Sequence, residues 1–404
     1  MLHKLRKSEI FKGSLILIVM FNLFNFFNYI FQFSMVRLLT VEDYGVLATL
    51  FAILYILSIF SESIQIMVTK YSSEEKNNGK VKNILKRAFA KGKIISMKIF
   101  IFYLVISIFL SYWLEISYWL MALNGIVIFT SFLIPINRGV MQGKKKFSAL
   151  GINMVIESLG KLVLAVTLVI LGWRVYGAIT GVIIGSLLAF LFSFFNIKDV
   201  LKEKEISAES QQIKLQAKPT FIVTFVILVF YSLDIVIAKA ILPTAELVGT
   251  YAIAAILAKT IFFGTQPVSR AMFPLTAENT EKKNGKVFKQ AIGIVMFLII
   301  VALILFYLFP EFIIWIFSGR YIKGAVEILF YLGIAIGLLS LSNLILLYKL
   351  SRGKRKGYFY LPIFLVLEAI LLFTFSETLI MFSLALIASS GMLLIASLLL
   401  LNER

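Results

Sequence analysis

The stretch LLTVEDYGVLA at Leu38–Ala48 recurs in altered form as LPTAELVGTYA at Leu242–Ala252. The two copies share Leu, Thr, Glu, Gly and Ala at equivalent positions, 204 residues apart. A second short match, NGKV, begins at Asn78 and again at Asn284. Because both matches occur in the same order and at nearly the same separation, we interpret the chain as two repeated halves.

Long apolar segments surround both copies of the repeat. Of the 404 residues, 60% are hydrophobic and 15% are charged, whereas soluble domains are about 45–50% apolar and about 25% charged. A transmembrane helix needs roughly 20 apolar residues, so the composition predicts an all-α, polytopic membrane protein with about twelve transmembrane helices. It excludes a soluble or a disordered protein. The expected spans are 13–36, 44–67, 95–114, 118–137, 151–171, 176–197, 219–242, 248–273, 290–309, 325–348, 358–376 and 378–401.

Basic residues are divided unevenly between the two sides of the predicted membrane. With an even number of spans, 33 of the 40 Lys and Arg residues, Arg138 among them, fall at the two termini and in alternate loops. The positive-inside rule therefore predicts a multi-pass protein of the cell membrane with both termini in the cytoplasm. The net charge of +19 then reflects topology and not nucleic-acid binding.

The repeat also predicts how the two halves are oriented. An even number of predicted spans separates the two copies, so the halves run in the same direction across the membrane. We expect a six-helix half at residues 1–205 and a second at 206–404, joined within a single membrane domain by the polar linker 198–218. Two parallel halves favour a transporter that works by alternating access around a central site.

Several classes of chemistry are excluded by composition. The chain has no Cys, and its single His lies at position 3 in a basic N-terminal tail. Cys-ligated metals and thiolate catalysis are therefore absent, and a Ser-His-Asp triad or an HExxH zinc site is not expected. No Walker A sequence is present for ATP use. We expect no enzyme activity, no catalytic or metal-binding residues and no cofactor.

Polar side chains recur along one face of the first span. Asn22, Asn25, Asn28 and Gln32 are spaced by three or four residues in an otherwise Phe-rich segment. One interpretation is hydrogen bonding between helices, and the other is the wall of a hydrated substrate cavity. The sequence leaves both interpretations open.

The second and eighth spans carry equivalent polar positions. Through the 204-residue offset, Tyr55 corresponds to Lys259 and Glu62 corresponds to Gln266. Lys259 lies roughly 16 Å into its span at 1.5 Å per residue, which is close to the membrane midplane. Glu62 and Arg270 lie nearer the cytoplasmic end, where a long side chain can reach water.

Carboxylates inside the predicted spans are candidates for ion coupling, because a charge at this depth is costly and usually functional. They are Asp234, Glu157, Glu62 and Glu368. Glu157 precedes Lys161 by four residues, so these two either form a self-neutralising pair or line a cavity. Asp234 is five residues from Lys239, a poor spacing for a pair, and we expect it to face inward. Glu368 has no partner nearby in the sequence.

Two segments resemble a known family. The segment RLLTVEDYGVLATL at Arg37–Leu50 resembles the first outer loop and second span of polysaccharide exporters, and DIVIAKAILPTAELVGTYAIAAILAK at Asp234–Lys259 resembles the matching part of their second half. These are the oligosaccharide flippases of the multidrug, oligosaccharidyl-lipid and polysaccharide exporter superfamily. The agreement in size, span number and parallel halves covers essentially the whole chain.

The resemblance implies a function and a set of partners. It implies that an oligosaccharide linked to a polyprenyl (pyro)phosphate is moved from the cytoplasmic to the outer leaflet, driven by a proton or sodium gradient. It also implies a cationic central cavity, which Lys259 and Lys161 would supply, with an anionic pyrophosphate as its ligand. The implied partners are the lipid-linked glycan, membrane lipids, the coupling ion and polysaccharide-assembly proteins.

Two other functions stay open at this stage. The first is an efflux antiporter for small molecules or drugs from the same superfamily, which the intramembrane carboxylates would serve. The second is a membrane enzyme of polysaccharide assembly, such as a polymerase or a ligase. Such enzymes usually have a sizeable outer loop with Arg or His residues, and this chain has only short loops there.

Overall fold

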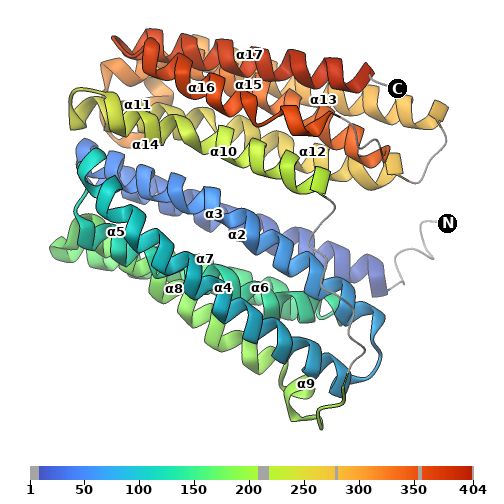
Figure 1. The fold of residues 1–404 in the computed structure, drawn as a ribbon. Coiled ribbons are helices and arrows are strands. Elements are labelled where there is room, and N and C mark those ends of the chain that lie inside the picture. Colours follow the sequence, from blue (N-terminus) through green and yellow to red (C-terminus); the bar gives the residue numbers. More distant parts are fainter. Residues whose placement is uncertain (1–8, 208–217, 278–280, 354–356, 403–404) are drawn as a thin grey trace. The chain divides into compact units, whose positions relative to one another are not determined.

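The computed structural model describes residues 9–207, 218–277, 281–353 and 357–402, and over these ranges the chain is built from helices joined by short connections (Figure 1). Among the described residues, nine helices are long and apolar enough to cross a membrane, and a shorter apolar helix covers Tyr358–Thr374. One of the nine, Phe147–Asn196, is 50 residues long and contains a sharp reversal. The prediction of an all-α, multi-pass membrane protein is therefore confirmed, whereas the number twelve stays a prediction.

The observed helices extend well beyond the apolar segments that predicted them. Helix α3 continues to Glu74 and helix α4 begins at Asn78, although the predicted spans were 44–67 and 95–114. Hydropathy marks only the part of a helix that lies in hydrocarbon, and charged residues do not end a helix where it reaches water. Asn77 starts α4 instead, because its side-chain oxygen accepts a hydrogen bond from the Gly79 amide at 2.8 Å.

The chain forms two compact units, which we describe separately. Unit 1 comprises Met1–Leu39 and Leu57–Gln216, and unit 2 comprises Thr40–Ile56 and Ala217–Arg404. Helix α3 (Val41–Glu74) is shared, since its first part packs with unit 2 and the rest belongs to unit 1. The division into two symmetric halves at residue 205 stays a prediction.

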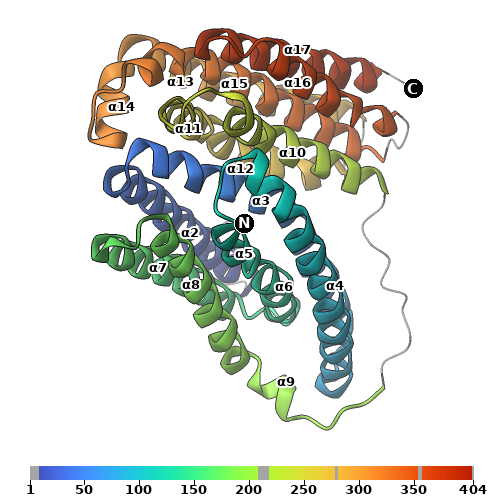
Figure 2. The same cartoon turned by 60° about the vertical axis from the view of Figure 1, so that its left-hand side comes forward.

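Unit 1 is a bundle of helices that follow one another in the chain. They are α2 (Glu9–Leu38), α4 (Asn78–Trp113), α5 (Tyr118–Gly125), α6 (Val127–Gly143), α7 (Phe147–Leu168), the π-helix η1 (Val169–Trp173), α8 (Arg174–Asn196) and the short α9 (Lys198–Lys202). Helix α7 packs against both α2 and α8 (Figure 2). The apolar core where α3, α4, α6 and α9 meet contains Val68, Val81, Ile136, Val140 and Val200.

Helices α7 and α8 form a tight antiparallel hairpin. Gly172 turns the chain with φ of 90°, a value that favours glycine. A Cβ atom at Gly181 would lie 2.4 Å from the Ala165 amide nitrogen, and one at Gly185 would lie 2.4 Å from the Lys161 amide nitrogen. The two glycines therefore let the backbones approach closely, as small residues do between membrane helices. This approach determines where the polar side chains of α7 lie.

The segment that follows α8 is fastened to α4. The Lys82 ammonium donates hydrogen bonds to the carbonyl oxygens of Leu201 and Glu203, at 2.7 and 2.8 Å, and Lys86 forms a 2.9 Å ion pair with Glu205. Hydrogen bonds from Lys86 and Asn83 lower the pKa of the Glu205 carboxyl. The first part of the predicted linker 198–218 thus belongs to unit 1, and residues 208–217 lie outside the described part of the chain.

Unit 2 contains the remaining helices together with the first part of α3. They are α10 (Lys218–Ile241), α11 (Ala245–Ala258), α12 (Thr260–Ala277), α13 (Glu281–Leu308), α14 (Pro310–Ser318), α15 (Lys323–Ser351), the 3-10 turn η2 (Tyr358–Tyr360), α16 (Ile363–Thr374) and α17 (Leu379–Asn402). Helix α15 is the most central, because it packs against α10, α11, α12, α13 and α17.

The residues shared by the two copies of the repeat have structural roles. Thr40 accepts a hydrogen bond from the Asp43 amide, and Thr244 accepts one from the Leu247 amide, so each shared Thr caps the start of its helix. The shared glycines meet each other within unit 2. A Cβ atom at Gly45 would lie 2.9 Å from the Gly249 nitrogen, and one at Gly249 would lie 1.9 Å from the Val41 carbonyl oxygen. The shared glycines of the repeat therefore lie where α3 and α11 cross at close distance.

Replacing Gly249 with Ala is expected to destabilise the protein by about 1–3 kcal/mol, because the added methyl group overlaps backbone atoms that cannot rotate away. The matched control is Gly264→Ala in α12, where a Cβ atom meets nothing within 4 Å. Thermal unfolding of the purified variants in detergent measures the difference. Equal melting temperatures for the two variants would contradict the close crossing.

Candidate functional site

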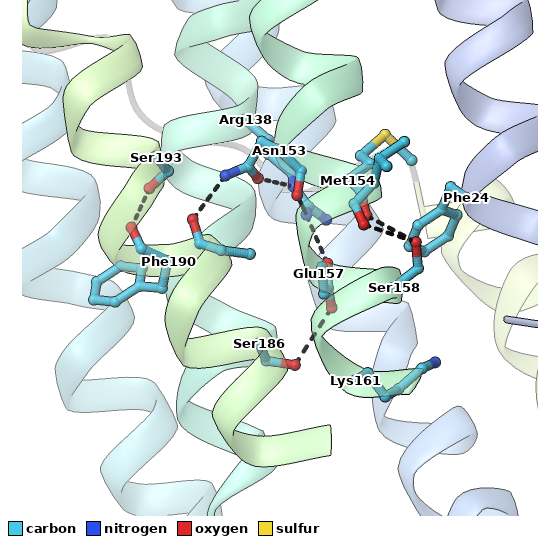
Figure 3. Close-up of polar contacts among 12 residues, drawn as sticks. Phe24, Arg138, Asn153, Met154, Glu157, Ser158, Lys161, Ser186, Phe190 and Ser193 are labelled. Atoms are coloured by element: carbon cyan, nitrogen blue, oxygen red, sulfur yellow. Dashed lines mark hydrogen bonds and ion pairs between the residues drawn. The ribbon is translucent and has the colours of Figure 1, made fainter. Parts of the chain in front are cut away.

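A polar cluster in unit 1 is built around Arg138 of α6 (Figure 3). The Arg138 Nη2 atom donates to Oε2 of Glu157 at 2.6 Å, and its Nε atom donates to Oδ1 of Asn153 at 2.8 Å. Asn153 is held in turn, since its Nδ2 atom donates to the Ala189 carbonyl oxygen at 2.7 Å. Ser186 of α8 donates to the other Glu157 oxygen at 3.4 Å. Three helices thus fix one guanidinium–carboxylate pair.

The local sequence explains why these groups meet. Helices α6 and α7 are joined by the short turn 144–146, so residues shortly before it lie beside residues shortly after it. Asn153 and Glu157 are four residues apart and share one face of α7. Arg138 lies about 8 Å and Glu157 about 15 Å along their helices from that turn, at 1.5 Å per residue. The pair therefore joins the bodies of the two helices and does not belong to the turn that connects them.

Lys161 completes the cluster from one turn further along α7. Its ammonium donates a hydrogen bond to Oδ1 of Asn28 on α2 and lies 4.9 Å from the centre of the Phe31 ring. Asn28 is anchored by a bond from its Nδ2 atom to the Phe24 carbonyl oxygen at 2.8 Å. The self-neutralising pair of Glu157 and Lys161 was one of two interpretations that the sequence left open. In the structure Glu157 is bonded to Arg138 and Lys161 is bonded to Asn28.

A second buried cluster lies in unit 2. The Lys259 ammonium donates to Oδ1 of Asp234 at 2.8 Å, and the Tyr251 hydroxyl donates to Oδ2 at 2.9 Å. Only 4% of the Lys259 side chain and 2% of the Asp234 side chain are exposed. The lysine also lies 4.8 Å from the centre of the Tyr231 ring. Asp234 is thus paired with Lys259 and not with Lys239, the nearby lysine that the sequence suggested as a poor partner.

Lys259 reaches Asp234 from the junction of two helices. It lies between the end of α11 at Ala258 and the start of α12 at Thr260. Tyr55, its equivalent in the first copy of the repeat, contacts the same Tyr231 ring with a centroid distance of 4.9 Å. The repeat thus brings both positions to one aromatic side chain within unit 2.

Glu368 on α16 is fully buried, and neither of its carboxyl oxygens has a hydrogen-bond partner in the described part of the chain. It lies within electrostatic range of Asp234 and Lys259. An ionised carboxylate in this setting is costly, so a buried acid without a partner is a candidate for ion exchange. Among the described residues, no three His, Cys, Asp or Glu side chains lie close enough together to hold a metal ion.

The other predicted site residues lie outside these two clusters or are only partly described. Asn22 and Asn25 are exposed on α2, and Gln32 is half-buried there. On α12, Gln266 is half-buried and Arg270 is exposed. These residues stay predictions. The backbone of Glu62 belongs to α3, but its side chain lies outside the described residues.

Sequence reasoning missed Arg138, Asn153 and Tyr251. Arg138 had been assigned to a cytoplasmic loop because the apolar run ends at residue 137, whereas the helix continues to Gly143. A usable signal for Asn153 was its place four residues before Glu157, on the same face as Lys161. No pattern in the sequence distinguishes Tyr251 from the other tyrosines.

Residues 34–327 match the family described as "Polysaccharide biosynthesis protein". The chain belongs to this family. The resemblance that the two repeat segments carry, to polysaccharide exporters of the multidrug, oligosaccharidyl-lipid and polysaccharide exporter superfamily, is thereby confirmed. Comparison with curated proteins gives no match.

Solved structures of transporters share the fold of this chain. An inward-facing MATE multidrug resistance transporter aligns with a TM-score of 0.73 at 14% identity, covering 93% of this chain and 94% of that one. The lipid II flippase MurJ, in an inward closed conformation, aligns with a TM-score of 0.70 at 16% identity, covering 94% and 87%. A transporter of the same superfamily from Pyrococcus furiosus aligns with a TM-score of 0.53 at 12% identity, covering 98% and 94%. These similarities show that the chain has the fold of these transporters.

Removing one partner of the Asp234–Lys259 pair is expected to destabilise the protein by about 3–5 kcal/mol, because the other charge stays buried without compensation. The double variant Asp234→Asn/Lys259→Met should recover much of this loss, since both charges are then gone. Thermal unfolding of the two single variants and the double variant in detergent measures the coupling. The control is Asp199→Asn, whose partner Lys146 is partly exposed and which should cost at most about 1 kcal/mol. Strictly additive effects at Asp234 and Lys259 would contradict the pairing.

Proposed function

We propose that this polysaccharide biosynthesis protein moves an oligosaccharide linked to a polyprenyl (pyro)phosphate from the cytoplasmic to the outer leaflet of the cell membrane, by alternating access. The observation that carries the proposal is the charge balance of the unit 1 cluster. Arg138 and Lys161 supply two cations, while Glu157 is the one anion bonded to either of them. A cluster with excess positive charge inside a membrane fold suits a phosphate-bearing lipid head group.

The two lysines expected to bind substrate have different surroundings, and this decides which one we assign to that role. Lys259 is neutralised by Asp234 and almost fully buried, so it cannot contact a head group in this conformation. Lys161 is only partly buried and bonds to a neutral amide. We therefore assign phosphate recognition to Lys161 and Arg138, with Asn28 beside them, and we keep Lys259 as part of the unit 2 cluster.

The energy source that we propose is an ion gradient, with a proton or sodium ion as the coupling species. Glu368 supports this role best, because its carboxyl group is fully buried, within electrostatic range of Asp234 and Lys259, and has no hydrogen-bond partner among the described residues. Asp234 belongs to the same cluster, and Glu157 and Glu62 are the candidates outside it. We keep both termini on the cytoplasmic side, as the distribution of basic residues predicts.

A second candidate function is efflux of a small molecule by antiport. The similarity of fold to a MATE multidrug resistance transporter favours it, and so do the two acidic side chains of the unit 2 cluster. A cationic drug would need an accessible carboxylate, however, and Asp234 and Glu368 are both buried in this conformation. The charge of the more accessible unit 1 cluster therefore favours an anionic substrate.

Reconstitution into lipid vesicles tests the proposal directly. A fluorescent polyprenyl-pyrophosphate oligosaccharide is expected to move between leaflets when a proton or sodium gradient is imposed. A membrane-impermeant reductant destroys the fluorescence of molecules in the outer leaflet of the vesicle only, so transport is measured as a loss of the fluorescence that was protected in the inner leaflet. Lys161→Ala should slow this movement about tenfold or more through loss of a charge-assisted bond, whereas Lys161→Arg should retain most of it.

The same vesicles distinguish the two candidate functions. Transport of a cationic dye in place of the labelled lipid would favour drug efflux. Movement of neither compound under any gradient, with folded protein in the vesicles, would contradict both transport proposals.

A further inference from the structure

The Arg138–Glu157 pair of unit 1 is more accessible than the Asp234–Lys259 pair of unit 2. The side chains of Arg138 and Glu157 are 11% and 22% exposed, compared with 4% and 2% for Lys259 and Asp234. A fully buried pair is locked by the cost of exposing or separating its charges. A partly exposed pair can exchange one partner for another charged group. The unit 1 pair is thus suited to open and the unit 2 pair is not.

Unused hydrogen-bond donors surround this pair. A guanidinium carries five N–H groups, and Arg138 uses its Nε and Nη2 atoms for Asn153 and Glu157, so no described residue accepts from Nη1. An ammonium carries three N–H groups, and Lys161 uses one of them for Asn28 in the described part of the chain. Both cations therefore have donors left for an anion with several oxygens.

We infer, building on the proposed function, that Glu157 occupies the position of the substrate phosphate on Arg138, and that the two exchange during transport. When the phosphate of the lipid-linked glycan binds Arg138, the Glu157 carboxylate swings to Lys161, which lies four residues further along α7. Glu before Lys at this spacing is the favourable order for a helical ion pair. Glu157 is paired with a cation both before and after the exchange, and Lys161, which bonds to the neutral Asn28 before it, gains a charged partner.

Asn153 allows the exchange without loss of the site. It accepts from Arg138 Nε, and it is itself fixed by its bond to the Ala189 carbonyl oxygen. The guanidinium therefore keeps its orientation when Glu157 leaves, and the Nη edge is presented to the phosphate. Asn153 is in this sense a positioning residue.

The exchange gives the transporter a way to release its substrate. A phosphate on an arginine in a low-dielectric site is bound strongly, and strong binding by itself slows turnover. A carboxylate that returns to the same arginine competes with the phosphate and lowers its affinity. Neutral sugars cannot displace a carboxylate from a guanidinium, so the exchange also selects for the phosphate-bearing end of the substrate.

The test is the affinity of the purified full-length protein for farnesyl pyrophosphate, a short polyprenyl pyrophosphate, measured by calorimetric titration in detergent. Glu157→Gln removes the competing charge and keeps the side-chain shape, and should tighten binding about tenfold or more. Arg138→Gln should weaken binding at least tenfold. The control Asp199→Asn makes the same kind of change at the Lys146 ion pair of unit 1 and should leave the affinity unchanged.

The kinetics of transport in vesicles provide a second measurement, which would not change in this way if Glu157 had a purely structural role. Glu157→Gln should lower KM and kcat together, because tighter binding slows release. In one outcome, the wild-type protein binds the probe and transports the labelled lipid, and folded Glu157→Gln binds the probe with the same affinity. That result overturns the exchange and leaves the proposed function standing. Absence of probe binding by the wild-type protein and all variants overturns both.

Discussion

A charge inside a membrane must be paired, and this constraint organises both units of the protein. The hydrocarbon offers no water to solvate an isolated charge. Three basic groups of the described residues that lie within the helix bundles each bond to an oxygen on another helix. Arg138 is bonded to Glu157 and Asn153, Lys161 to Asn28, and Lys259 to Asp234. These bonds connect α6 with α7, α7 with α2, and α10 with the α11–α12 junction, so they determine packing as well as charge.

Each unit also contains a close approach of two helix backbones at glycine. In unit 1, Gly181 and Gly185 bring α8 against α7, the helix that carries Asn153, Glu157 and Lys161. In unit 2, Gly249 brings α11 against the start of α3. The two units then differ in what their clusters can do. The unit 1 cluster is partly open and carries excess positive charge, whereas the unit 2 cluster is closed and contains Glu368, an acid without a hydrogen-bond partner among the described residues.

Much of the fold could be predicted because hydropathy and charge act locally along the chain. The predicted spans fall on helical segments of the described chain, although 118–137 and 248–273 each cover two helices. The shared Thr and Gly of the repeat have matching roles as caps and contact points. The site could be predicted only in part. Lys161, Asp234, Lys259 and Glu368 were identified from depth alone, but their partners were not. Arg138 was missed because a helix continued past the end of its apolar run.

The sequence by itself determined that this chain is a multi-pass helical membrane protein with an internal repeat, and that it belongs to a family of polysaccharide biosynthesis proteins. These properties follow from the amino-acid composition, the spacing of the two repeat copies and the short segments that match between them, and none of these depends on how the helices pack. Only the tertiary structure decided which charges are paired, since Asp234 and Lys259 are 25 residues apart on different helices, and Arg138 and Glu157 are 19 apart. Pairing depends on which helix faces meet, and that is set by close packing over the whole unit.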